Sequence, residues 1–200
     1  MTIIDGVLAD AHFSASAAVA RSKRVEEALV AYPIPLDQFL GVDGAELGVG
    51  EDTSSLYRKV SGNIVTLLGR TPDNTIEAAA VVAQFAMPPE YVANADVRVV
   101  VVAQFIDGAG ADSGRASTIG VEVYEQAAGA VGGDLNGTSA IAFSADDAYE
   151  TKTFTITDTD LAPGDLINIL VTASAKDDTG GGAPTQIEIG EVYLLLDIQG

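Results

Sequence analysis

Cysteine and tryptophan are absent from the 200 residues of this chain, and histidine occurs once, as His12. Without cysteine the chain has no disulfide and no zinc or iron–sulfur site that depends on thiolate ligands. Acyl-transfer triads and most catalytic zinc sites need a histidine as base or ligand, and His12 lies in the string Ala-His-Phe-Ser of a segment that reads as an arm. We therefore predict a protein that is not an enzyme, with no catalytic residue, no metal ligand and no cofactor.

Basic side chains are also few: 10 Lys and Arg stand against 29 Asp and Glu, which gives a net charge of −19. A surface this acidic repels phosphates, so nucleic acid is excluded as a partner. The charge is uneven, because residues 1–70 carry 6 basic and 9 acidic side chains and residues 71–200 carry 4 and 20. The difference indicates a nearly neutral N-terminal part and an acidic, well-solvated body that face different surroundings.

Long apolar runs are missing as well. The longest uncharged run, from Ala78 to Pro89, contains Gln84 and falls short of the roughly 20 residues that a membrane-spanning helix requires. Asp5 and Asp10 interrupt the first stretch of the chain, where a signal peptide would need an unbroken apolar core. We expect a soluble protein that has no membrane partner.

What the sequence does contain, from residue 74 onward, is alternation of apolar and polar residues with a period of two. β-Branched side chains are frequent at the apolar positions, as expected of half-buried strands. The clearest alternating segments are Val97–Phe105, Thr118–Val123, Thr153–Thr157 and Ile167–Ser174. Weaker candidates are Asn63–Leu68, Ile76–Met87 and Ser139–Phe143. With the C-terminal segment they make about eight strands.

The last apolar segment changes phase near its middle. Ile187 and Ile189 have one parity, and the apolar residues from Val192 to Ile198 have the other. One inserted residue restores a common face, so we predict a β-bulge at Gly190-Glu191.

Pro- and Gly-rich strings separate the predicted strands, and no long helical pattern lies among them. Pro163-Gly164 is typical of a tight turn, since Pro fixes φ and Gly supplies a positive φ. We predict an all-β protein, an antiparallel jelly-roll-like β-sandwich over residues 60–200 with an extended N-terminal arm over residues 1–59. An up-and-down barrel is the competing architecture. The core is predicted to include Val99, Val101, Val121, Phe154, Ile169 and Leu194.

Residues 1–59 lack the alternation. Lys23–Ala31 has the spacing of about two helical turns, whereas Tyr32–Leu36 must be extended because its two prolines restrict the residues before them. Residues 37–52 are Gly-rich and acidic, with no period. Such a segment either packs on its own sandwich or reaches a neighbouring subunit. In the second case the predicted partner-contact residues are Leu29, Tyr32, Ile34, Leu36 and Phe39.

Pairs of acidic residues are the remaining candidates for chemistry, at Asp146-Asp147, at Asp158 with Asp160, and at Asp177-Asp178. Two carboxylates can hydrolyse a glycoside and oxygen-rich loops can hold Ca²⁺. None of the pairs follows the EF-hand spacing, however, and such clusters are expected by chance in a chain this acidic. We interpret them as solvated loops, and a small hydrolase that uses an acid pair stays open as an alternative. The Gly-rich string Asp107–Gly114 leads into a strand rather than a helix, so we interpret it as a surface loop.

Three strings of the sequence resemble a known family. They are Ala86–Val92, the run from Phe154-Thr155-Ile156-Thr157 through Leu161–Asp165 into Leu166–Val171, and the ending Glu191–Ile198. These strings resemble the jelly-roll capsid decoration (cement) proteins of tailed bacteriophages, over residues 75–200. The resemblance implies a protein that sits on the outside of a viral shell, often as a trimer, and stabilises the shell without chemistry.

The main prediction is therefore a structural virion protein, made in the host cytoplasm, that binds the major capsid protein on the capsid exterior as a homotrimer. The alternative is a carbohydrate- or receptor-binding jelly-roll module of a phage tail or fibre, because jelly rolls also serve as lectins. The absence of tryptophan counts against the alternative, since aromatic side chains supply the flat apolar surfaces on which sugars stack.

Overall fold

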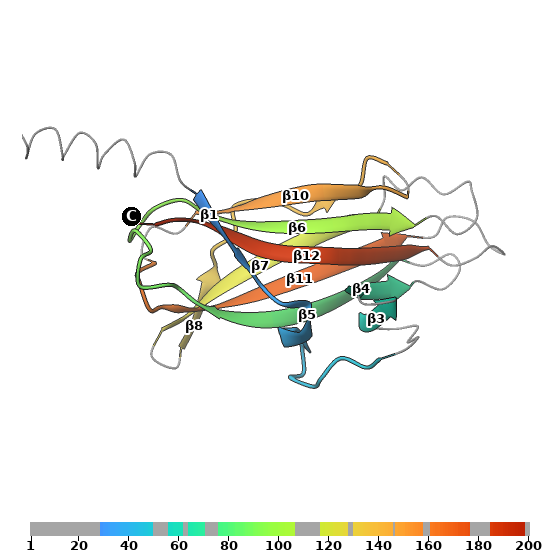
Figure 1. Cartoon of the computed structure of the whole chain (residues 1–200), viewed down its shortest axis with the longest axis horizontal. Helices are drawn as coiled ribbons and strands as arrows, with labels where there is room; N and C mark the ends of the chain where they lie inside the picture. Colours follow the sequence, from blue (N-terminus) through green and yellow to red (C-terminus); the bar gives the residue numbers. More distant parts are fainter. Residues whose placement is uncertain are drawn as a thin grey trace, which may run out of the picture.

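Two antiparallel β-sheets packed face to face form the fold of the computed structural model (Figure 1). The structure describes residues 29–49, 56–61, 64–70, 76–106, 117–127, 130–145, 147–157, 161–176 and 185–198. The long strands run along the long axis of the molecule (Figure 1). Their apolar residues at every second position face the opposite sheet, which is how a period of two builds a sandwich core.

Sheet A contains six strands: β1 (Leu29–Pro33), β3 (Tyr57–Ser61), β4 (Ile64–Arg70), β6 (Val97–Ile106), β10 (Tyr149–Ile156) and β12 (Gln186–Asp197). β12 pairs with β6 along one side. Along its other side β12 pairs first with β4 and then with β1. β10 and β3 form the outer edges of this sheet.

Sheet B also contains six strands: β2 (Leu40–Gly41), β5 (Ile76–Ala86), β7 (Thr118–Ala127), β8 (Ala130–Asp134), β9 (Ile141–Ala142) and β11 (Leu166–Lys176). β11 pairs with β5 on one side and with β7 on the other. β2 extends the sheet beyond β5, and β8 and β9 both pair with β7. A short 3₁₀ turn, η1 (Leu36–Gln38), connects β1 of sheet A to β2 of sheet B.

The order of the strands is that of a jelly roll. β4, β6, β10 and β12 lie in sheet A, while β5, β7 and β11 lie in sheet B, so the chain passes repeatedly from one sheet to the other. The last strand of the chain, β12, lies between the early strands β4 and β6, and β11 lies between β5 and β7. This wrapping confirms the predicted antiparallel jelly-roll β-sandwich and replaces the competing up-and-down barrel, in which neighbours in sequence would pair.

The core lies between the sheets, where buried strand positions alternate with half-buried ones in β6 and with exposed ones in β10. All six residues predicted for the core are buried there, with Val121 5% exposed and the other five not exposed. The largest side chains that the core buries almost completely are those of Tyr91, Phe39, Phe105 and Phe154. Aliphatic residues from the strands fill most of the remainder, as the low aromatic content requires.

The predicted bulge in the last strand is confirmed. The register between β12 and β6 shifts between Ile189, which faces Ala103, and Glu191, which faces Val102. The inserted residue places Ile189 and Val192 on the same, inward side, and both are buried.

The N-terminal segment differs from the prediction. Leu29–Pro33 is a strand that pairs with β12 from Asp197 to Tyr193, so the predicted helix is wrong for Leu29–Ala31. Its earlier part, residues 23–28, lies outside the described residues. The physical reason is the edge of β12: β4 pairs with it only as far as Ile189, and the edge beyond needs another strand to satisfy its ladder.

β1 and β2 therefore belong to the sandwich, and the boundary predicted between residues 59 and 60 falls inside β3. Of the two alternatives for this segment, packing on its own sandwich describes residues 29–49. The three weaker strand candidates correspond to β4, β5 and β9, whereas β3 and β8 were not predicted. In the part of the chain that the structure describes, no helix has the length and apolarity needed to cross a membrane.

Candidate functional site

A row of polar side chains crosses the outer face of sheet B. Asn168 of β11 faces Gln84 of β5 on one side and Tyr124 of β7 on the other. Tyr124 also faces Asp134 of β8, so the row runs across four neighbouring strands. These positions face outward, because alternate residues such as Ile167 are buried in the core. At about 4.8 Å per strand, three steps give the row a length of about 14 Å.

Hydrogen bonds between side chains hold this row in place. Gln84 Nε2 donates to Asn168 Oδ1 at 3.0 Å and to Gln126 Oε1 at 3.2 Å. Tyr124 Oη donates to Glu122 Oε2. That hydrogen bond, together with burial and the nearby negative charge, raises the pKa of Tyr124 from 10.0 to about 12. Tyr124 therefore stays protonated past pH 10, where a free tyrosine ionises, and its hydroxyl remains the donor in this hydrogen bond.

Two hollows flank the row. One, of about 420 Å³, is lined by Gln38, Leu40, Val82, Ala83, Gln84 and Asn168. The other, of about 290 Å³, is lined by Thr118, Gly120, Val121, Glu122, Asp134, Asn136, Thr138, Ser139, Ala140, Thr172 and Ser174. We call the row and its two hollows the polar trough.

The second hollow exists because the side chains beneath it are small. Gly120 of β7 lies opposite Thr172 of β11, and a Cβ on Gly120 would lie 3.7 Å from the Ala140 Cβ. Around this floor, Asn136 Nδ2 donates to the carbonyl of Thr138 at 2.8 Å, and the amide N–H of Thr138 donates back to Asn136 Oδ1 at 2.9 Å. The rim of the trough is thus ordered by local hydrogen bonds, and its surface offers amides and hydroxyls together with the carboxylates of Glu122 and Asp134.

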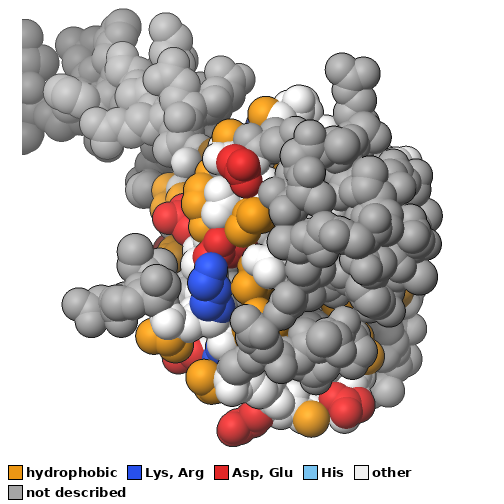
Figure 2. All heavy atoms as spheres, turned by 90° about the vertical axis from the view of Figure 1, so that its right-hand side faces the viewer, with side chains coloured by type: hydrophobic (Ala, Val, Ile, Leu, Met, Phe, Trp, Pro, Cys, Tyr) orange, Lys and Arg blue, Asp and Glu red, His pale blue; other side chains and the backbone are white. Residues whose placement is uncertain are grey.

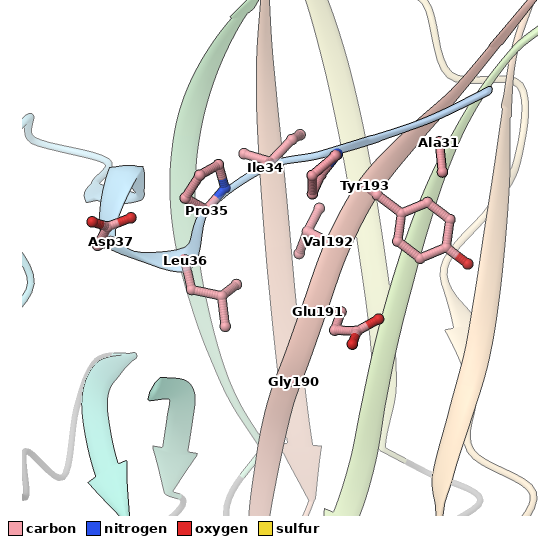
Figure 3. A pocket seen from close by; sticks show the side chains of 10 residues that line it. Ala31, Ile34, Pro35, Leu36, Asp37, Gly190, Glu191, Val192 and Tyr193 are labelled. Carbon is pink, nitrogen blue, oxygen red and sulfur yellow. The ribbon is translucent and has the colours of Figure 1, made fainter. Parts of the chain in front are cut away.

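A third hollow, which is more apolar and has a volume of about 690 Å³, lies beside the bulge of β12 (Figure 3). We call it the bulge groove; its lining residues are Ala31, Pro33, Ile34, Pro35, Leu36, Asp37, Gly190, Glu191, Val192 and Tyr193. Figure 3 shows Pro35 and Leu36 on one side of the groove, and Glu191 and Tyr193 reaching to the other side of β12.

Strand pairing explains why the groove forms at this place. β4 pairs with β12 up to Ile189 and β1 pairs with β12 from Tyr193 onward, along the same edge. Between those two points the described strands leave Gly190 and Glu191 without a partner on that edge. The next contact is the N–H of Ile34, which donates to the Val192 carbonyl at 2.8 Å and draws the chain away toward η1.

Tyr149 of β10 closes the far side of the bulge. Its ring reaches over β6, so that a Cβ on Gly190 would lie 3.0 Å from Tyr149 Cε1. The Tyr149 side chain is nevertheless 49% exposed. Glycine at position 190 thus permits the close approach of an aromatic ring, and leaves part of that ring facing outward beside Glu191.

Two polar clusters are structural rather than exposed. Glu188 is 8% exposed and accepts from Thr66 Oγ1 at 2.7 Å and from Gln104 Nε2 at 2.9 Å. Lys152 is 5% exposed and its Nζ donates to Glu150 Oε2 at 2.6 Å. Buried charges need partners of this kind, so these groups are explained by the stability of the fold.

Basic side chains lie together on the edge strand β3. Figure 2 views the molecule from the end where β3 and β4 lie, and basic side chains appear there with hydrophobic and acidic side chains around them. Arg58 and Lys59 line a hollow of about 320 Å³ at this strand. Arg58 Nη2 donates to the Asp37 carbonyl at 2.7 Å, and Lys59 Nζ lies 3.8 Å from Glu188 Oε2. Both are therefore engaged within the chain.

The five residues predicted to contact a partner differ in their burial and in their contacts. Phe39 is fully buried and Ile34 is 3% exposed, so both side chains belong to the core of this chain. Tyr32 packs edge-to-face on Phe85, with ring centroids 6.2 Å apart. Leu36 is partly buried, and Leu29 is 39% exposed. Of the five, the structure brings Ile34 and Leu36 together, in the bulge groove; contact with a partner stays a prediction.

The acid pairs fall largely outside the described residues, which include Asp147 but not its neighbour or the other two pairs. Among the residues that are described, no group of three or more His, Asp or Glu side chains could hold a metal ion.

The polar trough was not predicted, because its members come from strands far apart in the sequence. The only sign of the trough in the sequence is a polar residue at an outward position of each of these strands.

No protein-family model and no curated protein matches this sequence. Solved structures with a similar fold include TmCBM61 in complex with β-1,4-galactotriose, at 14% identity over 68% of this chain and 72% of that chain, with a TM-score of 0.39. A putative sugar binding protein from Bacteroides thetaiotaomicron is 10% identical over 86% and 91% of the two chains, with a TM-score of 0.39. A single-residue mutant of CBM29-2, a family 29 carbohydrate binding module, is 11% identical over 83% and 91%, with a TM-score of 0.32.

Proposed function

We propose that this protein is a binding module that takes a neutral glycan in the polar trough of sheet B. The observation that carries the proposal is the row Gln84, Asn168, Tyr124 and Asp134, which crosses four strands in register. A hydrogen bond of 3.0 Å from Gln84 Nε2 to Asn168 Oδ1 already orders these two side chains. A ligand that binds a surface ordered in advance loses less free energy to the ordering of side chains.

The chemistry of the trough matches sugar hydroxyls. A hydroxyl both donates and accepts, and so do the amides of Gln84, Asn168 and Gln126 and the hydroxyls of Thr172 and Ser174. Small side chains under the second hollow let a flat ring approach the backbone closely. An uncharged ligand also suits a chain of net charge −19, because an anionic glycan would be repelled from it.

Carboxylates in the trough strengthen this choice of ligand. Glu122 and Asp134 line the second hollow and can accept from sugar hydroxyls in hydrogen bonds that a charged acceptor makes stronger. Tyr124 lies between the amide pair and Asp134 in the same row, where its partly exposed ring can pack against the C–H groups of a sugar.

Binding to an array of neutral and acidic glycans, followed by calorimetry on the hits, tests the proposal. Asn168→Ala and Gln84→Ala should each weaken binding by about ten-fold, the loss of about one hydrogen bond of 1.4 kcal/mol. Thr153→Ala, on the exposed outer face of β10 in the other sheet, is the matched control and should bind as the wild type does. Absence of any glycan ligand, or binding that neither trough variant alters, contradicts the proposal.

A second candidate function is attachment to a viral shell, as the resemblance to phage decoration proteins implies. We propose it because Leu36, one of the residues predicted to contact a partner, is partly exposed and lines an apolar groove on the surface. In this proposal a homotrimer binds the major capsid protein on the capsid exterior, and its repeated contacts raise the avidity above that of one site.

Mixing the protein with undecorated shells and sedimenting them tests this second function. The wild-type protein should co-sediment at micromolar concentration in low and high salt, because an apolar contact depends weakly on ionic strength. Leu36→Asp should abolish co-sedimentation, whereas Thr153→Asp, which adds the same charge on β10, should not. A protein that is monomeric by light scattering and stays in the supernatant would rule out this function.

A further inference from the structure

The bulge groove has walls that are fixed before any ligand arrives. Pro33 and Pro35 lock two φ angles on either side of Ile34. The Ile34 side chain is anchored in the core at 3% exposure, and its N–H donates to the Val192 carbonyl at 2.8 Å. A wall built this way has little conformational freedom to lose on binding, so even a small apolar group can bind to it with a net gain.

The floor of the groove exposes an edge of the sheet. Among the described strands, none pairs with Gly190 or Glu191 on the edge that β4 and β1 share. An extended chain that lies there can use backbone groups of β12 as well as the apolar wall, which is the geometry by which peptides recognise sheet edges. The gap is short, so a few residues of such a chain would fill it.

The charged residues at the rim of the groove indicate which kind of peptide segment would bind there. Asp37 and Glu191 are the charged residues among those that line the groove, and both are exposed. Arg58 Nη2 donates to the backbone carbonyl of Asp37 at 2.7 Å and brings a positive charge beside Asp37, whereas no ion pair of Glu191 is found among the described residues. Figure 3 shows the Glu191 carboxylate and the Tyr193 ring on the same side of β12, where a cation could meet both.

We propose that the bulge groove is a docking site for an extended segment of another protein, which places one aliphatic side chain against Leu36 and a Lys or Arg against Glu191. A second copy of this chain is a poor occupant, because each copy carries a net charge of −19. The inference goes beyond glycan binding, and it deepens the second proposed function by naming the chemistry of the partner. It does not depend on that partner being a shell protein.

Three synthetic peptides with the cores Gly-Lys-Leu-Lys-Gly, Gly-Lys-Ala-Lys-Gly and Gly-Glu-Leu-Glu-Gly test the inference. Each is titrated into the ¹⁵N-labelled full chain, and amide chemical shifts report where it binds. The Lys-Leu-Lys peptide should shift the amides of Leu36, Gly190 and Glu191 in a saturable manner. The alanine peptide should bind about ten-fold more weakly, and the glutamate peptide should leave these amides unchanged.

Two variants and a control locate the contacts. Leu36→Ser should abolish the shifts, and Glu191→Gln should weaken the binding of the Lys-Leu-Lys peptide by removing the counter-charge for its lysines. Thr153→Ser on the outer face of the same sheet should leave the affinity unchanged. Absence of saturable shifts, shifts centred elsewhere, or equal binding of the glutamate peptide would overturn the inference. A glycan that shifts Gln84 and Asn168 in the same sample tests the trough separately, so each proposal can fail alone.

Discussion

At the scale of single residues, Lys152 is the charge that the sandwich buries most deeply among its described ion pairs. Its Nζ donates to the Ala142 carbonyl and to Glu150 Oε2, both at 2.6 Å, and lies 4.8 Å from the centre of the Phe143 ring. Burial opposes ionisation of Glu150, but hydrogen bonds from Lys152 and from Ala145 and Ser144 outweigh it and lower its pKa from 4.5 to about 2. The charged pair is thus a fixed part of the fold.

Glu150→Gln should lower the free energy of unfolding at pH 7 by about 3 kcal/mol, because it leaves the buried Lys152 ammonium without its counter-charge. Since the pKa of Glu150 is lower in the folded state, its contribution is present above about pH 4.5 and is lost as pH falls toward 2. Urea unfolding at several pH values checks this. The wild type should lose its advantage over the variant across that window, and the exposed control Glu191→Gln should not change the profile.

Substitutions at Phe39 and Leu29 distinguish the two roles considered for the N-terminal segment, which are packing on its own sandwich and contact with a neighbouring subunit. Phe39→Ala should cost about 3 to 5 kcal/mol, because the side chain is fully buried and its removal leaves a cavity. Leu29→Ala should cost less than about 1 kcal/mol, since that side chain is 39% exposed. Chemical denaturation of both variants measures the difference. Equal and small effects would show that residues 29–49 are not part of the cooperative sandwich.

At the scale of strands, the period of two was enough to predict β6, β10, β11 and the bulge in β12. These strands have one buried face, so their sequences alternate, and a change of parity at Gly190 has one simple physical cause. β1 was missed because the spacing of Lys23–Ala31 favours a helix, whereas the strand starts at Leu29 and ends at Pro33, where a missing N–H is tolerated. β2 has two residues, too few for any period to appear.

The polar trough could not be predicted for a related reason. Outward positions of Gln84, Asn168 and Tyr124 follow from the alternation of each strand, but their alignment depends on the register of β5, β11 and β7. Register is set by the pairing of strands that are 40 or more residues apart in the sequence. The bulge groove likewise needs β1 and β4 to share one edge of β12, which no local pattern encodes.

Deleting Gly190 tests whether the bulge sets the register of β12. Without the inserted residue, one half of β12 must turn its apolar side chains outward and its polar ones into the core, so the deletion variant should not fold. Gly190→Ala keeps the parity and should cost about 1 kcal/mol, because the new Cβ displaces the Tyr149 ring. Circular dichroism and thermal melting distinguish the two. A deletion variant that melts like the wild type would refute this account of the register.

At the scale of the whole molecule, the two sheets present different outer surfaces. Sheet B carries the polar trough, with its amides and hydroxyls, and sheet A carries the apolar bulge groove with carboxylates at its rim. The surfaces lie on opposite faces of one sandwich, so a glycan and a protein segment could be bound at the same time.

The net charge of −19 leads to the last prediction, since like charges on a folded chain lie closer together than on an unfolded one. Raising NaCl from about 0.01 to about 0.5 M at pH 7 shortens the screening length from about 30 Å to less than about 10 Å. The repulsion should fall, and Tm should rise by about 2 to 4 °C, the shift that about 1 kcal/mol produces in a domain of this size. Calorimetry in NaCl and in KCl measures it, and the two salts should agree if screening is the cause. A Tm that is constant or falls with salt would mean that favourable ion pairs, such as Lys59 with Glu188, outweigh the repulsion among the acidic residues.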